Sequence, residues 1–162
     1  MSSVNNNLSW TKGSAIPDAS EYSFGIVWAE WNEDITGAMR DGAYKTLIAN
    51  GAKPENIITK AVPGSFELTL GAQMMAENTD VDAVICIGCV IQGETKHFDF
   101  ICSAVAHGIT DLNREFGIPF VFGVLTPDNQ QQAIDRAGGK HGNKGDEAAI
   151  TAIKMVALED SF

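Results

Sequence analysis

The sequence predicts a three-layer α/β/α domain, in which a four-stranded parallel sheet has helices on both faces. Four short apolar runs alternate with longer stretches whose apolar residues recur every three or four positions. Such alternation is typical of strands that take turns with helices. One run, residues 82–91, is apolar at nearly every position, as expected of a central parallel strand buried on both faces. We assign residues 1–21 to an N-terminal arm and residues 22–162 to a single domain.

The four predicted strands are bounded by residues that interrupt a ladder of hydrogen bonds. They cover residues 23–29, 56–62, 82–91 and 120–125. Pro54 turns the chain into the second strand, Pro63 and Gly64 stop that strand, and Pro119 opens the fourth.

Five helices are predicted between and after these strands. Their periodic segments lie within residues 35–48, 66–77, 101–112, 128–136 and 149–158. Asn32 and Ser65 stand where they can cap the first two helices, and Gly51 ends the first.

The composition of the chain argues against some classes of function. The 162 residues are 44% hydrophobic and 20% charged, which is ordinary for a soluble globular domain. A net charge of −10 repels phosphate-rich surfaces, so we expect no nucleic acid and no membrane as partner. No apolar run approaches the ~20 residues that span a bilayer. With three cysteines and no signal-peptide pattern at the start, we expect reduced thiols and a cytoplasmic location.

Ligands of an open parallel sheet bind beyond the carboxyl ends of its strands. That rule selects residues 28–32, 62–67 and 91–97. His97 follows a strand end and could move protons near neutral pH, although a surface histidine at a helix start is the plain alternative.

Two segments are candidates for binding an anion. Gly93, Glu94 and Thr95 form a turn before a helix, where backbone N–H groups and the helix dipole favour negative charge. The Glu94 carboxylate would repel a phosphate, so only its backbone N–H helps. Arg136 and Lys144 flank a glycine-rich stretch that also contains Lys140 and His141, and the arginine offers a bidentate fork. A solvated basic patch would look the same.

The pattern C-x-x-C at Cys86 and Cys89 resembles a redox or zinc motif, but it falls within a predicted strand. Residues three apart in a strand point to opposite faces, so we expect the thiols to diverge and predict no metal site. Cys102 is predicted to be a helix core residue.

An aromatic residue and a carboxylate complete the candidate set. Trp31 follows the first strand and could stack on a flat heterocycle or simply cover a helix end. Phe66 and Glu67 begin the second predicted helix. Glu67 could accept hydrogen bonds from a polyol, or could serve only the helix dipole.

Five blocks in register make the chain similar to the lumazine synthase family, whose fold is flavodoxin-like. They are Trp31-Asn32, V-P-G-x-x-E at residues 62–67, G-x-V-I-x-G-x-T-x-H-F at residues 88–98, F-G-V-L-T at residues 122–126, and A-x-x-R-A-G-x-K-x-G-N-K-G, which starts at Ala133 and ends at Gly145. Many relatives have Arg or Lys where Gln92 stands, and residues 1–21 do not map onto the pattern.

The resemblance implies a reaction without cofactor or metal. A ribitylaminouracil condenses with 3,4-dihydroxy-2-butanone 4-phosphate, phosphate and water leave, and 6,7-dimethyl-8-ribityllumazine forms, the penultimate step of riboflavin biosynthesis. By position, His97 matches the proton-shuttling residue, and Arg136 with Glu94 and Thr95 matches the phosphate clamp. The other matched binding residues are Trp31, Asn32, Ser65, Phe66, Glu67, Val90, Ile91, Gly93, Phe122 and Lys144. Of these, Phe122 and Lys144 match residues that a neighbouring subunit contributes.

The family resemblance also implies self-assembly. The site lies between subunits of a pentamer, and the short loop before the last helix favours an icosahedral 60-mer. Riboflavin synthase is a candidate partner.

Three other functions fit parts of the sequence. A riboflavin-binding paralogue would use the same pocket without needing His97 or Arg136. A flavodoxin-like signalling or electron-transfer domain would need a phosphate loop or an acidic cluster after the first strand, which residues 28–31 do not offer clearly. A purely structural shell protein would explain the fold alone.

Overall fold

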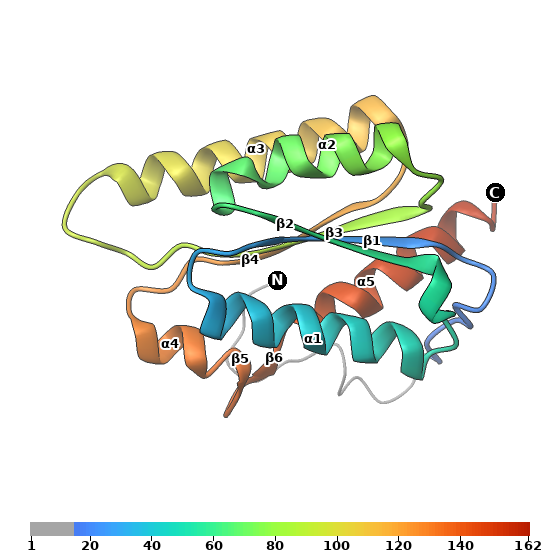
Figure 1. Cartoon of the computed structure of the whole chain (residues 1–162), viewed down its shortest axis with the longest axis horizontal. Helices are drawn as coiled ribbons and strands as arrows, with labels where there is room; N and C mark the ends of the chain where they lie inside the picture. Colours follow the sequence, from blue (N-terminus) through green and yellow to red (C-terminus); the bar gives the residue numbers. More distant parts are fainter. Residues whose placement is uncertain (1–14) are drawn as a thin grey trace.

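The computed structural model describes residues 15–162 and shows the predicted parallel sheet (Figure 1). Its strands are β1 (Phe24–Ala29), β2 (Ile57–Val62), β3 (Ala83–Cys89) and β4 (Phe120–Leu125). They lie in the order β2-β1-β3-β4, and every neighbouring pair is parallel. All four strands therefore end at one edge of the sheet, at the left of Figure 1, where the loops that lead into α1, α2, α3 and α4 gather.

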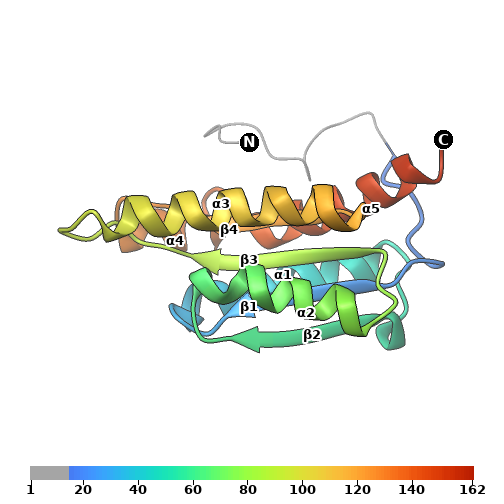
Figure 2. The ribbon, with the colours of Figure 1, turned by 90° about the horizontal axis from the view of Figure 1, so that it is seen from above.

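Helices cover both faces of the sheet, as predicted. The elements on one face are α1 (Glu33–Ala49) and α5 (Lys144–Glu159), and those on the other are α2 (Leu68–Asn78) and α3 (His97–Phe116) (Figures 1 and 2). Shorter elements complete the fold: α4 (Gln130–Ile134), the 3-10 turns η2 (Pro54–Asn56) and η3 (Ser65–Glu67), and a hairpin of β5 (Ala137–Gly139) and β6 (Gly142–Asn143). Within the described residues, no helix is long and apolar enough to cross a membrane.

β3 separates two apolar cores, because its side chains alternate between the faces. Ile85, Ile87 and Cys89 belong to the core beneath α1 and α5, whereas Val84 and Cys86 belong to the core beneath α2 and α3. The two thiols of the C-x-x-C pattern therefore point to opposite faces, as predicted. Cys102 was expected in a helix core, yet it is only half-buried on α3.

Burial makes the strand thiols weak acids. It raises the pKa of both Cys86 and Cys89 to about 12, and it raises the pKa of Cys102 as well. Because the thiolate is the reactive form, we expect a disulfide reagent at neutral pH to modify Cys102 first and the two strand cysteines only on unfolding. Equal rates for all three thiols in the folded protein would contradict this. In the unfolded chain these thiols have the ordinary pKa of about 9, so they lose their protons there before they do in the folded protein. The free energy of unfolding therefore falls as pH rises from about 9 to 12.

α1 and α5 pack with almost no space between their backbones. A Cβ atom on Gly145 would overlap the carbonyl group of Met39 in α1. Asn143 joins the two helices, because its Oδ1 accepts from Gly145 N–H at 2.8 Å and its Nδ2 donates to Ala38 O at 2.9 Å. The start of α5 is thus held against the middle of α1.

Neither predicted cap on the first two helices forms. Asn32 does precede α1, but its backbone is left-handed, with φ 62° and ψ 45°, and its side chain makes no capping bond. Ser65 lies inside the turn η3, and α2 begins only at Leu68. In both places the side chain turns toward the sheet and not toward the start of the helix. The preference of these residue types for cap positions takes no account of such a tertiary contact.

Other parts of the fold also differ from the prediction. β3 ends at Cys89, two residues early, α4 covers Gln130–Ile134 only, and the glycine-rich stretch forms the β5–β6 hairpin. Gly138 and Gly142 adopt φ of 114° and 75° there, which only glycine tolerates easily.

The last residues assigned to the arm contact the domain. Ala19 is buried in the core of α1 and α5, Ile16 packs against it, and Ala19 N–H donates to Asn50 O at 2.8 Å. Residues 1–14 of the assigned arm lie outside the described residues, and the arm boundary stays a prediction.

Candidate active site

Backbone hydrogen bonds bring the first two selected loops together. Glu30 N–H donates to Val62 O at 2.8 Å, and Trp31 N–H donates to Pro63 O at 3.1 Å, so the loop after β1 runs beside the loop after β2. Asn32 connects the first loop to the third strand, because its Nδ2 donates to Cys89 O at 3.0 Å. The left-handed backbone of Asn32 permits this inward turn. The three strand ends are therefore joined at one place.

Two aromatic rings and one carboxylate stand on these loops. Trp31 is 72% exposed and Phe66 is 57% exposed, which is unusual for such large apolar side chains. Glu67 is also exposed, and its Oε2 lies 3.1 Å from the position that a Cβ atom on Gly64 would occupy. The rings of Trp31 and Phe66 and the carboxylate of Glu67 are thus all open to solvent. A ring can stack on a flat heterocycle, and a carboxylate can accept hydrogen bonds from a polyol.

Ser65 behaves differently from its neighbours. The residue is only 7% exposed, and its hydroxyl is buried with no hydrogen-bond partner among residues 15–162. A buried hydroxyl without a partner costs about 1–3 kcal/mol. Ser65 is therefore held by packing against the sheet, whereas Phe66 and Glu67 project from it.

The third loop reaches beyond the sheet edge, at the far left of Figures 1 and 2. Its base is bonded to the loop after β4: Val90 N–H donates to Leu125 O at 2.8 Å, and Gln92 N–H donates to Pro127 O at 3.0 Å. Val90 and Ile91 are half-buried, one against each core. The loop therefore starts from a fixed base and ends in an exposed turn.

That exposed turn contains the predicted anion-binding residues and leads into α3. Gly93, Glu94 and Thr95 are exposed, and the Thr95 hydroxyl accepts from His97 N–H at 3.4 Å. A hydroxyl that accepts from the backbone can still donate its own proton, so Thr95 can bond an anion. His97 is exposed at the first residue of α3, and its ring makes no hydrogen bond within residues 15–162. The imidazole is free to exchange protons with a ligand.

The cationic side chains of the glycine-rich stretch differ in whether they are paired with a carboxylate. Lys140 pairs with Asp135 at 2.8 Å, and Lys144 pairs with Glu147 at 2.5 Å. The ion pair with Lys140 holds the pKa of Asp135 below its ordinary value. Arg136 makes no ion pair within the described part of the chain, and its Nη1 donates to Gln132 O at 3.0 Å. Its charge is the one left for an external anion.

The hairpin also fixes the spacing of two predicted site residues. Lys144 N–H donates to Arg136 O at 2.9 Å, so Arg136 and Lys144 flank the β5–β6 hairpin side by side. Their backbones move together, and a shift of α5 would displace both.

Phe122 lies away from Trp31 in a single chain. It is in the middle of β4, 44% exposed, three residues before the strand ends at Leu125. β3 lies between β4 and β1, which separates Phe122 from β1 by about 10 Å across the sheet and from the edge by about another 10 Å. One copy of the chain therefore does not place Phe122 beside the tryptophan ring.

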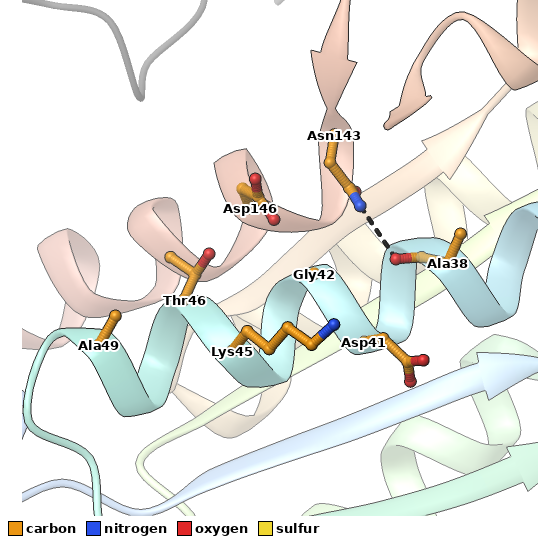
Figure 3. Close-up of a pocket in the computed structure, with 8 residues that line it drawn as sticks. All are labelled: Ala38, Asp41, Gly42, Lys45, Thr46, Ala49, Asn143 and Asp146. Atoms are coloured by element: carbon orange, nitrogen blue, oxygen red, sulfur yellow. Dashed lines mark hydrogen bonds between the residues drawn. The ribbon is translucent and has the colours of Figure 1, made fainter. Parts of the chain in front are cut away.

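Two grooves in the described part of the chain lie outside the loops after β1 and β3. One, of about 590 Å³, runs along the seam of α1 and α5 and is lined by polar residues that include Asp41, Lys45 and Asp146 (Figure 3). Burial raises the pKa of Asp146, although the Thr46 hydroxyl and Lys45 oppose this. The other, of about 280 Å³, lies between α2 and α3 beside Phe66 and Leu70. Neither contains His97 or Arg136.

Sequence reasoning missed two residues that shape this edge. Glu147 holds the Lys144 ammonium group, and the i,i+3 spacing of opposite charges was a signal for that pair. Gly88, near the end of β3, lies directly against Ser65. No sequence signal indicates which turn packs on a strand glycine.

Comparison with known proteins adds an independent result. The family model described as 6,7-dimethyl-8-ribityllumazine synthase matches residues 21–160. A protein of that name from Cytophaga hutchinsonii is 62% identical over 157 residues, which is 97% of this chain and 98% of the relative. One from Parabacteroides distasonis is 58% identical, covering 96% and 98% of the two chains. One from Phocaeicola vulgatus is 50% identical, covering 100% and 96%.

Proposed function

The chain belongs to the 6,7-dimethyl-8-ribityllumazine synthase family, and on that basis we propose that it catalyses this synthesis. It condenses 5-amino-6-(D-ribitylamino)uracil with L-3,4-dihydroxy-2-butanone 4-phosphate, and it is a transferase of riboflavin biosynthesis. The observation that supports this best is the joining of the ends of β1, β2 and β3, which places Trp31, Glu67 and the turn before His97 at one edge of the sheet.

The chemistry divides into steps that these residues can assist. The amine of the pyrimidine attacks the ketone and water leaves to give an imine. Phosphate is then eliminated, and the second amine closes the ring with loss of another water. His97 is proposed to carry protons between these steps, because its ring is exposed and unbonded.

Loss of phosphate needs positive charge and donors held in place. Arg136 is proposed to clamp the phosphate with the Thr95 hydroxyl and the backbone at Gly93 and Glu94, because its guanidinium makes no ion pair within residues 15–162. Holding both substrates in one geometry supplies a further part of the rate.

The pyrimidine and its ribityl chain are proposed to lie on the loops after β1, β2 and β3. Trp31 stacks on the ring, and Glu67 accepts hydrogen bonds from the polyol, because both side chains are exposed there. The other proposed contacts are Asn32, Ser65, Phe66, Val90 and Ile91.

A second subunit is proposed to complete the site. Phe122 is exposed but far from Trp31 in its own chain, and Lys144 and Arg136 lie beside each other on the hairpin. An assembly in which Phe122 and Lys144 of one subunit cover the loops of the next would use both facts. We propose a pentamer that assembles into an icosahedral 60-mer.

The apolar face of α2 and α3 supports assembly. Phe66, Leu70, Met74 and Phe100 are all exposed on or next to these helices, and exposed apolar side chains that gather on one face are typical of a protein–protein interface. Size-exclusion chromatography with light scattering tests the assembly. A monomer at all salt and pH values would contradict any assembly, and a pentamer alone would contradict the 60-mer. A cytoplasmic location and riboflavin synthase as a partner remain proposals of the same kind.

The first experiment is an absorbance assay for lumazine formation from the two substrates. Activity of the wild type supports the synthase, whereas an inactive chain that binds riboflavin tightly is the non-catalytic paralogue.

Arg136→Ala is expected to lower kcat/KM for the phosphorylated substrate by about 10² to 10³-fold, because a charged donor to the leaving group is removed. The KM for the pyrimidine should change little. Arg136→Lys keeps the charge but not the fork and should recover only part of the activity. Lys140→Ala is the matched control on the same hairpin, since Lys140 is paired with Asp135. Equal losses for both substrates in Arg136→Ala would contradict the clamp.

A further inference from the structure

β3 has a gap in its row of side chains on the α2 side. Val84 and Cys86 fill that face with full side chains, and the next residue in the row is Gly88. Gly88 is buried and lies one residue before the end of the strand. The gap is therefore at the carboxyl edge, beneath the loops of the candidate site.

The turn η3 fills this gap. A Cβ atom on Gly88 would lie 2.7 Å from Ser65 Oγ, 2.8 Å from Leu68 Cδ1 and 3.3 Å from Ser65 Cβ. The first two distances are shorter than real Cβ contacts, and the Ser65 Cβ atom at 3.3 Å is also crowded, so a side chain at position 88 would displace Ser65 and Leu68 from their present positions. Ser65 occupies the space that such a side chain would need.

The contact works by shape rather than by polarity. The Ser65 hydroxyl is enclosed and has no hydrogen-bond partner within residues 15–162, so nothing polar fixes its position. The next two residues, Phe66 and Glu67, are exposed and belong to the same short turn as Ser65. Their height over the strand ends depends on how deeply Ser65 sits.

We propose that Gly88 is a positioning residue for the pyrimidine substrate. By leaving room for Ser65, it sets the height at which Phe66 and Glu67 meet the ribityl chain and the ring. This inference rests on the proposed function, and it adds a residue that touches no substrate itself. The phosphate side of the site is held by separate bonds, from Val90 to Leu125 and from Gln92 to Pro127.

The test is steady-state kinetics of Gly88→Ala with each substrate varied in turn. We expect the KM for the pyrimidine to rise about tenfold or more, since a misplacement of under 1 Å is enough for such a loss. The KM for the butanone phosphate should stay within about twofold. A uniform rise in both KM values, or no rise at all, would overturn the proposal.

Gly25→Ala is the matched control. Gly25 is also a strand glycine that faces α2, and its Cβ atom would lie 2.8 Å from Met75 Cγ, but it is at the opposite end of β1. It should lower the melting temperature without changing either KM. If Gly25→Ala raised the pyrimidine KM as Gly88→Ala does, general strain would explain both and the proposal would fail.

A second variant can relieve the crowding between position 88 and Ser65. Recovery of the pyrimidine KM in that double variant is a result that a general loss of stability would not give. Ser65→Ala removes the atom at 2.7 Å, so the double variant Ser65→Ala/Gly88→Ala should have a lower pyrimidine KM than Gly88→Ala alone. Ser65→Ala alone is measured as the reference for the double variant, because Ser65 is itself a proposed substrate contact. A double variant no better than Gly88→Ala alone would overturn the proposal.

Ser65→Thr replaces Gly88→Ala if the latter does not fold. It adds a methyl group to the same contact from the turn, and the same selective rise in the pyrimidine KM is expected. An unchanged KM in that variant would refute the positioning role. A wild-type chain inactive with both substrates would instead refute the proposed function, so the two failures are distinguishable.

Discussion

Replacing His97 with alanine is expected to lower kcat by about 10² to 10⁴-fold, the range for loss of a general acid–base group. Proton transfer accompanies imine formation, phosphate loss and ring closure, so each step loses its shuttle. The melting temperature should not change, because the ring is exposed and makes no hydrogen bond within residues 15–162. Stopped-flow or steady-state absorbance measures kcat, and calorimetry measures the melting temperature.

His107→Ala is the control for this prediction. His107 is also exposed on α3, but its Nδ1 bonds to Ser103 O at 2.7 Å within the helix itself. Its removal should leave kcat unchanged. If His97→Ala keeps more than half of the wild-type kcat, solvent or substrate groups carry the protons and the role given to His97 is wrong.

The strands and the large helices were predictable because burial on two faces imposes a local pattern. The four apolar runs became β1 to β4, and the opposite orientation of Cys86 and Cys89 followed from the strand period alone. The rule that ligands bind at carboxyl ends then selected three loops. The first two are bonded to each other, and Asn32 of the first is bonded to Cys89 at the end of β3.

The caps were not predictable, because they depend on what lies opposite the side chain. Asn32 has the right residue type for a cap, yet Cys89 O lies within its reach once the backbone is left-handed. Ser65 also has the right type, yet it fills the gap left by Gly88. In both cases a contact with a residue distant in sequence outweighed a preference worth only about 1 kcal/mol.

The completeness of the site was not predictable from one chain either. The sequence blocks place Trp31 and Phe122 in one functional set, but the strand order separates them by two strand positions. Only the family resemblance, not spacing or periodicity, suggested that a second subunit supplies Phe122 and Lys144.

Replacing Gly145 with alanine is expected to destabilise the fold by more than about 4 kcal/mol, a large share of the 5–15 kcal/mol that holds most domains together. The added methyl group would overlap the Met39 carbonyl group, and backbone atoms at the middle of α1 cannot turn away as a side-chain end can. α5 would have to leave α1 at its first turn. Asn143 would then lose its bond to Ala38 O, and Lys144 and Arg136 would shift with the hairpin.

Gly37→Ala separates this clash from the general effect of adding a methyl group to a helix. Gly37 is buried in α1, but its Cβ atom would meet neighbours only at 3.8 and 3.9 Å, an ordinary contact. That variant should gain about 0.5–1 kcal/mol, because alanine favours the helix more than glycine does. Melting temperatures measured at one protein concentration compare the two variants. A Gly145→Ala protein that melts within a few degrees of wild type would mean that α1 and α5 can slide apart at little cost, and the α1–α5 seam would then not be what fixes Lys144 and Arg136.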